Sequence, residues 1–316
     1  MFGVRLLAEK LAVKITQEFP AYQFGWNMLG ALLKQNGRIN EALGASQKAV
    51  QLAPQDAEAH FNLGITLQEL GRSGEAEASY KQAIALKPDA DAHCNLGIAL
   101  QALGRLDEAE ASYTQAIALK FDFALAHSNL GNTLKELGRL KEAEASYTQA
   151  IALEPDYADA HYNLGNTLNE LGRLDEAGAS YTQAITLKPD FAEAHYNIGT
   201  TLKELCRIEE AEASLRQAIA LKPDYADAHD HLGSILQVKE KFEDAEVCYI
   251  KCMSLEPNKT NPLTLSRGSI LFRQGLFEQA LNIFDKYDNV RSRANALESL
   301  YALGRVDDIY ERIEAK

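Results

Sequence analysis

Apolar residues recur along this chain at three- and four-residue intervals, the spacing that places side chains on one face of a helix. Between residues 57 and 71 the apolar positions are Leu63, Leu67 and Leu70, and Gly71 follows them directly. Glycine readily adopts the left-handed backbone conformation that closes a helix. The pattern therefore predicts a first helix that ends at Gly71.

A second amphipathic stretch follows and is bounded by glycine and proline. It begins near Gly74, and Pro88 ends it because proline cannot donate the next backbone hydrogen bond. Gly64 in the first helix and Ala76 in the second are small enough to let the two helices approach closely. The apolar positions of the second helix are Ala76, Tyr80, Ala83, Ile84 and Leu86.

This helical pair is one copy of a unit that repeats along most of the chain. The interval between copies is 34 residues except between Gly64 and Gly97, where it is 33. The residue missing there is the aromatic that follows Pro-Asp in later copies, since Asp89 runs directly into Ala90. One unit cannot bury its apolar face alone, so the units are expected to stack. The phase is marked by Gly30, Gly64, Gly97, Gly131, Gly165, Gly199 and Gly233.

The repeat resembles the tetratricopeptide repeat family. In the first full unit the family signature is matched by Trp26, Leu29, Gly30, Ala42 and Pro54. In the second unit it is matched by Leu63, Gly64, Ala76, Tyr80, Ala83 and Pro88. The resemblance covers at least residues 23–259. It implies an all-α fold, a right-handed superhelical solenoid of stacked antiparallel helix pairs, with a concave groove lined by the first helices.

We expect one continuous solenoid in three parts. Residues 1–22 are predicted to be an N-terminal half-repeat or capping helix, and residues 23–259 to be seven repeat units. Residues 260–316 are predicted to be degenerate repeat or capping helices, in which Gly268, Gly275 and Phe284 keep the phase. Terminal units must expose one face to solvent, so this drift from the repeat is expected.

Three positions depart from the repeat at the ends of helices. Phe121 stands where other units have the helix-stopping proline, and Cys206 and Glu240 replace the glycine that closes the first helix. A residue other than glycine in the left-handed region costs about 1 kcal/mol. We predict locally looser turns at these positions, without a change of fold.

Six of the seven histidines occupy one repeat position. A row of imidazoles raises the possibility of a metal site, but equivalent side chains in adjacent helices lie about 8 to 10 Å apart. Two nitrogens that share a zinc ion must lie within about 4 Å of each other. Trp26 takes this position in the first unit, so we interpret it as a packing position and expect no metal. The six are His60, His93, His127, His161, His195 and His229.

A row of asparagines occupies a second repeat position, which we place on the concave side. The row resembles the asparagine ladder in the repeat region of O-linked N-acetylglucosamine transferases, where the amides bind the backbone of an extended peptide. An amide both donates and accepts, so it can bind a main chain whatever the side chains are. The alternative is that these amides are solvated or bond within the array. The row is Asn62, Asn95, Asn129, Asn163 and Asn197, and Asn132 and Asn166 add amides three residues further on.

Composition and charge restrict the classes of partner that we expect. An apolar fraction of 46% in 316 residues is typical of a globular chain. No stretch approaches the roughly 20 apolar residues of a membrane span, so no membrane partner is expected. The net charge of −13 argues against nucleic acid, which requires clustered Lys and Arg. Carboxylates outnumber ammonium groups on the first helices, so basic or neutral protein segments are expected as partners rather than acidic ones.

The four cysteines form no CxxC pair. They are expected to be free thiols in a reducing compartment, which favours a cytoplasmic location. Nothing in the sequence calls for a cofactor. The four are Cys94, Cys206, Cys248 and Cys252.

No catalytic motif is found: the chain has no phosphate-binding loop, dinucleotide glycine pattern, nucleophile elbow or HExxH. The leading hypothesis is a non-catalytic protein–protein interaction scaffold that binds extended peptide segments in a concave groove. The alternative is the N-terminal targeting or substrate-recognition region of a larger enzyme. Arrays of this kind resemble those that precede glycosyltransferase, sulfotransferase or 2-oxoglutarate-dependent oxygenase domains. Near-identical units also offer many equivalent edges, so self-association is a third hypothesis.

Overall fold

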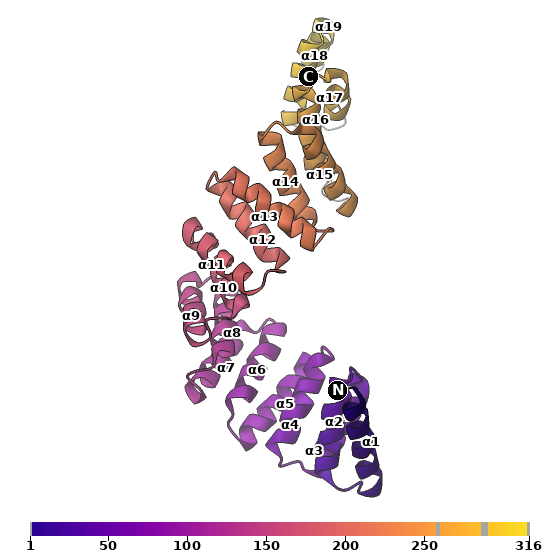
Figure 1. The fold of residues 1–316 in the computed structure, drawn as a ribbon, viewed down its shortest axis with the longest axis vertical. Coiled ribbons are helices and arrows are strands. Elements are labelled where there is room, and N and C mark those ends of the chain that lie inside the picture. The colour runs from indigo at the N-terminus through magenta and orange to yellow at the C-terminus, as the bar shows by residue number, and fades with distance from the viewer. Residues whose placement is uncertain (1, 257–259, 286–289, 315–316) are drawn as a thin grey trace. The chain divides into compact units, whose positions relative to one another are not determined.

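The computed structural model describes the backbone of residues 2–256, 260–285 and 290–314, which form helices and turns and no strand (Figure 1). Side chains are described for residues 7–256, 266–285 and 293–312. The chain divides between Thr167 and Leu168 into two compact units, and the boundary falls inside α10 (Ala158–Glu170). The predicted all-α class and the stacking of helix pairs are confirmed in each unit.

The first unit begins with α1 (Phe2–Glu18) and continues as helix pairs. Each pair packs against the next, and the first helices of neighbouring pairs also touch, since α4 contacts both α2 and α6, and α6 contacts α8. The pairs are α2 (Gln23–Gln35) with α3 (Ile39–Leu52), α4 (Ala57–Glu69) with α5 (Ser73–Leu86), α6 (Ala90–Ala102) with α7 (Leu106–Leu119), and α8 (Ala124–Glu136) with α9 (Leu140–Leu153).

The second unit follows the same plan. From α11 onward each helix packs against the next, and α12 also contacts α14. The predicted division into residues 1–22, 23–259 and 260–316 stays a prediction. The helices are α11 (Leu174–Leu187), α12 (Ala192–Glu204), α13 (Ile208–Leu221), α14 (Ala226–Val238), α15 (Phe242–Leu255), α16 (Thr260–Arg273), α17 (Phe277–Phe284), α18 (Val290–Ala302) and α19 (Val306–Glu314).

In the pairs α4–α5, α6–α7, α8–α9 and α14–α15 the two helices approach closely because a tyrosine of the second lies on a glycine of the first. Tyr113 is fully buried, and a Cβ atom added at Gly97 would lie 2.5 Å from its Cε1 atom. Tyr80 lies on Gly64 in the same way. A separation of 2.5 Å is far below the roughly 3.5 to 4.0 Å of a normal carbon–carbon contact. The repeating glycine is therefore a packing requirement.

The first helices end in left-handed residues, as the sequence predicts. Gly71 has φ +71°, and Cys206 and Glu240, which replace glycine, both have φ 59°. The turns at Gly71 and Cys206 have the same hydrogen bonds: the N–H of the following residue donates to Leu67 at 2.9 Å and to Leu202 at 2.8 Å. The structure thus keeps the glycine geometry without glycine. Whether these turns are looser stays a prediction.

The end of α7 shows that proline is not needed to stop the second helix. Phe121 stands at the proline position, yet α7 ends at Leu119, as α5 ends at Leu86 before Pro88. The N–H of Lys120 donates to the Ala116 carbonyl at 2.9 Å and closes the helix. The predicted looseness at Phe121 is likewise untested.

Candidate functional site

The histidine row ties consecutive helix pairs together. Nε2 of His60 lies 3.0 Å from the carbonyl oxygen of Pro54, six residues earlier, at the end of the preceding helix pair. The indole of Trp26 makes the same bond to Pro20 at 3.0 Å, and an indole can only donate. The imidazoles therefore donate from Nε2. The same contact recurs at His127, His161, His195 and His229.

These contacts within the array agree with the packing interpretation of this row. Among the residues that the structure describes, no three His, Cys, Asp or Glu side chains lie close enough together to hold a metal ion. His93, in the 33-residue unit, is the exception in the row, because no such tie is found for it within the described ranges. Its Nδ1 atom is buried without a hydrogen bond, and burial lowers its pKa.

The asparagine row lies on consecutive first helices of the first unit. Asn62 is on α4, Asn95 on α6, Asn129 on α8 and Asn163 on α10, and each is half-buried. Asn132 and Asn166 lie on α8 and α10, one helical turn after the row.

In the second unit Asn197 occupies the row position on α12, and His231 takes that position on α14. The asparagine pattern predicts members of the row only as far as Asn197, and His231 is not predicted from it. The ring of His231 meets the edge of the Tyr196 ring at 5.5 Å, and its Nδ1 is buried without a partner among the described residues. Burial lowers the pKa of His231, and Lys203 lowers it further.

The structure brings two of the predicted amides into direct contact. Oδ1 of Asn132 accepts a hydrogen bond from the hydroxyl of Tyr147 at 2.7 Å and another from Nδ2 of Asn163 at 3.1 Å. Asn95 instead donates to the Asp91 carbonyl of its own helix at 2.8 Å. Bonding within the array, the alternative for this row, is therefore observed for these three side chains and for Asn129, whose Nδ2 donates to Sγ of Cys94 at 3.9 Å. The two roles can coexist because each amide has four bonding sites.

A set of glutamines, which the sequence reasoning did not single out, has a related role. The hydroxyl of Tyr80 donates to Gln68 at 2.8 Å, and Tyr249 donates to Gln237 at 3.0 Å. These glutamines stand four residues after the repeat glycine. In the pair α8–α9 that position is Lys135, and Asn132 accepts the tyrosine bond in place of glutamine. The replacement of glutamine by Lys135 is the sequence signal from which a different partner for the tyrosine could have been predicted.

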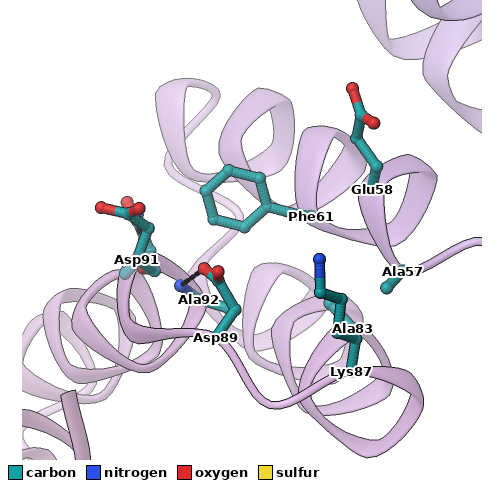
Figure 2. Close-up of a pocket in the computed structure, with 9 residues that line it drawn as sticks. Ala57, Glu58, Phe61, Ala83, Lys87, Asp89, Asp91 and Ala92 are labelled. Atoms are coloured by element: carbon teal, nitrogen blue, oxygen red, sulfur yellow. Dashed lines mark hydrogen bonds between the residues drawn. The ribbon is translucent and has the colours of Figure 1, made fainter. Parts of the chain in front are cut away.

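A hollow of about 520 Å³ lies beside Asn95, between the pair α4–α5 and α6. Figure 2 shows the Phe61 ring and the ammonium group of Lys87 facing the same space. The carboxylate of Asp89 is held at the edge by the N–H of Ala92 at 3.1 Å. The missing residue is visible in the sequence, but the sequence predicts no hollow at this place. The lining residues are Ala57, Glu58, Phe61, Ala83, Lys87, Asp89, Asp91, Ala92 and Asn95.

Carboxylates differ in their pairing between the first and second helices. At the start of α5, Arg72 forms an ion pair with Glu75 at 2.6 Å and holds the pKa of that carboxyl below its usual value. Glu58, Asp91 and Asp159, near the start of first helices, are exposed and make no ion pair within the described residues. These three positions therefore add unneutralised negative charge to the first helices of this unit.

Stacked helix pairs that tie their ends together through a repeated ring define a helical-repeat protein. Models described as tetratricopeptide repeat match residues 25–89, 61–124, 128–192, 172–235 and 226–259. Together these ranges run from 25 to 259. The chain belongs to the tetratricopeptide repeat family.

Relatives among characterised proteins match over a short stretch. The protein O-mannosyl-transferase Tmtc3 of Drosophila melanogaster is 43% identical over 63 residues, which is 20% of this chain and 7% of that protein. The TMTC3 protein of Mus musculus is 41% identical over 63 residues, with the same coverage. The chain thus matches less than a tenth of the length of these relatives.

Two solved structures share the fold. The Cut9–Hcn1 complex of the APC/C has a TM-score of 0.60 at 19% identity, covering 85% of this chain and 52% of that chain. PilF of Pseudomonas aeruginosa has a TM-score of 0.59 at 20% identity, covering 64% and 92%. At this level of identity the likeness shows the fold alone. In the part of the chain that the structure describes, no helix is long and apolar enough to cross a bilayer.

Proposed function

We propose that the chain is a non-catalytic scaffold whose first unit binds an extended protein segment along the first helices. The observation that carries this proposal is the chain of bonds from Tyr147 to Asn132 to Asn163. Because Oδ1 of Asn132 accepts both bonds, its orientation is set, and its Nδ2 protons have no partner among the described residues. The Oδ1 atom of Asn163 belongs to the amide whose Nδ2 donates to Asn132, so the orientation of this acceptor is also set. A fixed amide donor beside a fixed amide acceptor complements the C=O and N–H groups of a peptide backbone.

Charge favours a basic or neutral segment. The unpaired carboxylates of Glu58, Asp91 and Asp159 lie in the first turns of α4, α6 and α10. Negative charge at these positions suits the positive end of each helix. An acidic segment placed along these helices would be repelled, and a basic one would be attracted, more strongly at low ionic strength.

The test compares binding of short synthetic peptides of basic, neutral and acidic composition by isothermal titration. The double variant Asn132→Ala, Asn163→Ala is expected to weaken binding about tenfold, because each lost backbone bond is worth roughly 0.5–1.5 kcal/mol. The matched control is Asn36→Ala, Asn40→Ala, which removes two amides outside the row. Equal loss in both variants, or a preference of the wild type for acidic peptides, would overturn the proposal.

A second candidate is the recognition region of a larger enzyme. The observation that favours it is the local match to the O-mannosyl-transferases, which are transferases much longer than this chain. In that case the same amide surface would present protein substrates to a catalytic domain. Sequencing the parent reading frame decides between the two, because a stop codon directly after Lys316 would exclude this candidate.

We also propose a cytoplasmic location and leave self-association as a hypothesis to be measured. None of the four cysteines is joined to another in a disulfide, which favours a reducing compartment. Fractionation of cells that express the full reading frame tests the location. Light scattering over a concentration series tests self-association, and a constant monomer mass would rule it out.

A further inference from the structure

We propose that the hollow between α4 and α6 takes an aromatic side chain of a bound protein segment, flanked in that segment by a basic residue. The proposal rests on the proposed function, because it assumes that the partner is a protein segment. It adds a side-chain pocket to a site that otherwise recognises only the backbone.

The second unit shows what fills the equivalent place when the repeat has its full length. There the ring of Tyr225, the residue that precedes α14, lies 4.8 Å from the ring of Tyr196 on α12. Nζ of Lys222 lies 4.8 Å above the Tyr225 ring and 3.4 Å from the carboxylate of Glu193. A ring is thus held between an aromatic face, an ammonium group and a carboxylate.

The hollow has every member of this arrangement except the ring. Relative to the repeat glycine, Phe61 stands at the position of Tyr196, and Glu58 at that of Glu193. Lys87 precedes Pro88 as Lys222 precedes the proline of its own unit. The residue that caps α6 is Asp89, where Tyr225 precedes α14.

The ring-and-ammonium contact recurs at two further full-length joints, those before α8 and α12. Nζ of Lys120 lies 4.5 Å from the Phe123 ring, and Nζ of Lys188 lies 4.4 Å from the Phe191 ring. Such contacts are attractive, and more so where the ammonium group is desolvated. At the 33-residue unit the deleted position leaves Lys87 and Phe61 without a ring of this kind. A ring from another chain can complete the same contacts.

Size and charge select the ligand. A volume of about 520 Å³ lies within the range of small-ligand sites and accommodates one aromatic side chain. Three carboxylates, on Glu58, Asp89 and Asp91, surround the single ammonium group of Lys87. An anionic group is therefore disfavoured, and a Lys or Arg next to the aromatic residue is favoured.

The experiment measures two blocked tripeptides, Lys-Tyr-Lys and Lys-Ala-Lys, by NMR titration against the whole chain. We expect the tyrosine peptide to bind about tenfold more tightly, with shifts at Phe61 and Ala92. Inserting a tyrosine between Asp89 and Ala90 restores the 34-residue length and should fill the hollow from within. This variant is expected to bind the two peptides equally.

A matched control opens the same space elsewhere. Tyr225→Ala removes the ring from the intact joint and is expected to add a second tyrosine-dependent site. If the insertion variant loses its helical circular dichroism spectrum, Phe61→Leu replaces it, since it keeps the apolar contact, removes the ring face and should reduce the preference. No preference for tyrosine in the wild type, or an undiminished preference in the insertion or Phe61→Leu variant, would overturn the proposal.

The two proposals fail separately. The insertion and Phe61→Leu variants leave Asn132 and Asn163 intact, so backbone binding of longer peptides should survive in both. If the preference for tyrosine persists but the Asn132→Ala, Asn163→Ala variant binds longer peptides as tightly as the wild type does, the backbone role is refuted and the pocket is retained.

Discussion

The contact between Gly97 and Tyr113 predicts that one methyl group destabilises the first unit. In Gly97→Ala the new Cβ meets three ring atoms of Tyr113, at 2.5, 2.7 and 2.8 Å. Tyr113 is fully buried and donates to Gln101 at 3.3 Å, so the ring cannot move aside without loss.

The magnitude follows from three opposing effects. Overpacking of this severity costs about 3 kcal/mol, and a strained or lost tyrosine bond costs about 1 kcal/mol. Replacing glycine by alanine inside a helix returns about 1 kcal/mol. The free energy of unfolding should therefore fall by about 3 kcal/mol.

Urea unfolding followed by circular dichroism measures this change as a lower midpoint at an unchanged slope. Hydrogen exchange should show the loss of protection centred on α6 and α7. The control is Gly44→Ala in α3, where a Cβ meets nothing within 4 Å and only the gain of about 0.5–1 kcal/mol should remain. If Gly97→Ala stabilised the chain as Gly44→Ala does, the packing argument would be wrong.

Three further predictions concern the turns, a buried imidazole and the thiols. Glu240→Gly should raise the free energy of unfolding by about 0.5–1 kcal/mol, because the relief of the left-handed backbone exceeds the entropy that glycine gains on unfolding. An unchanged urea midpoint would show that the turn is unstrained. The lowered pKa of His231 means that the unfolded chain binds a proton first, so stability is present above pH about 6.5 and falls as the pH drops through that value. His231→Gln should flatten this loss between pH 7.5 and 5, and an identical slope would contradict it. Iodoacetamide should label the exposed Cys206 in the folded protein and leave the three buried thiols unlabelled until the chain unfolds. Burial raises the pKa of the Cys94 thiol to about 11, which disfavours the reactive thiolate. Equal labelling of all four, measured by mass spectrometry, would refute this prediction. The protected thiols are Cys94, Cys248 and Cys252.

The helix pairs were predictable because their packing needs particular residues at fixed positions. Only glycine fits under Tyr113, so Gly97 and its equivalents reveal the period directly. For the histidine row the sequence predicts a packing position, because Trp26 stands in the same place. Its bonding partner could not be predicted, because it is a backbone carbonyl of the preceding helix pair.

The candidate site was less predictable, because its details depend on side-chain orientation. Asn132 and Asn163 are 31 residues apart, and only the folded structure shows that one bonds to the other. The 33-residue spacing was visible in the sequence. That Asp89 moves into the capping position and leaves a space beside Phe61 depends on how the chain enters α6. The peptide-binding role of the row remains a prediction.

The bond between a histidine ring and a carbonyl six residues earlier makes the helix pairs exchangeable. Both partners of the bond come from fixed repeat positions, so removing or duplicating one 34-residue block recreates the bond at the new junction. The junction before α6 is different, because His93 has no such bond among the described residues. Replacing the 33-residue block that contains this junction by any 34-residue block would restore the residue that is missing between Asp89 and Ala90. Gain or loss of 34-residue blocks therefore changes the number of helix pairs on either side of the hollow. The 33-residue spacing between Gly64 and Gly97, which marks the hollow in the sequence, stays unchanged.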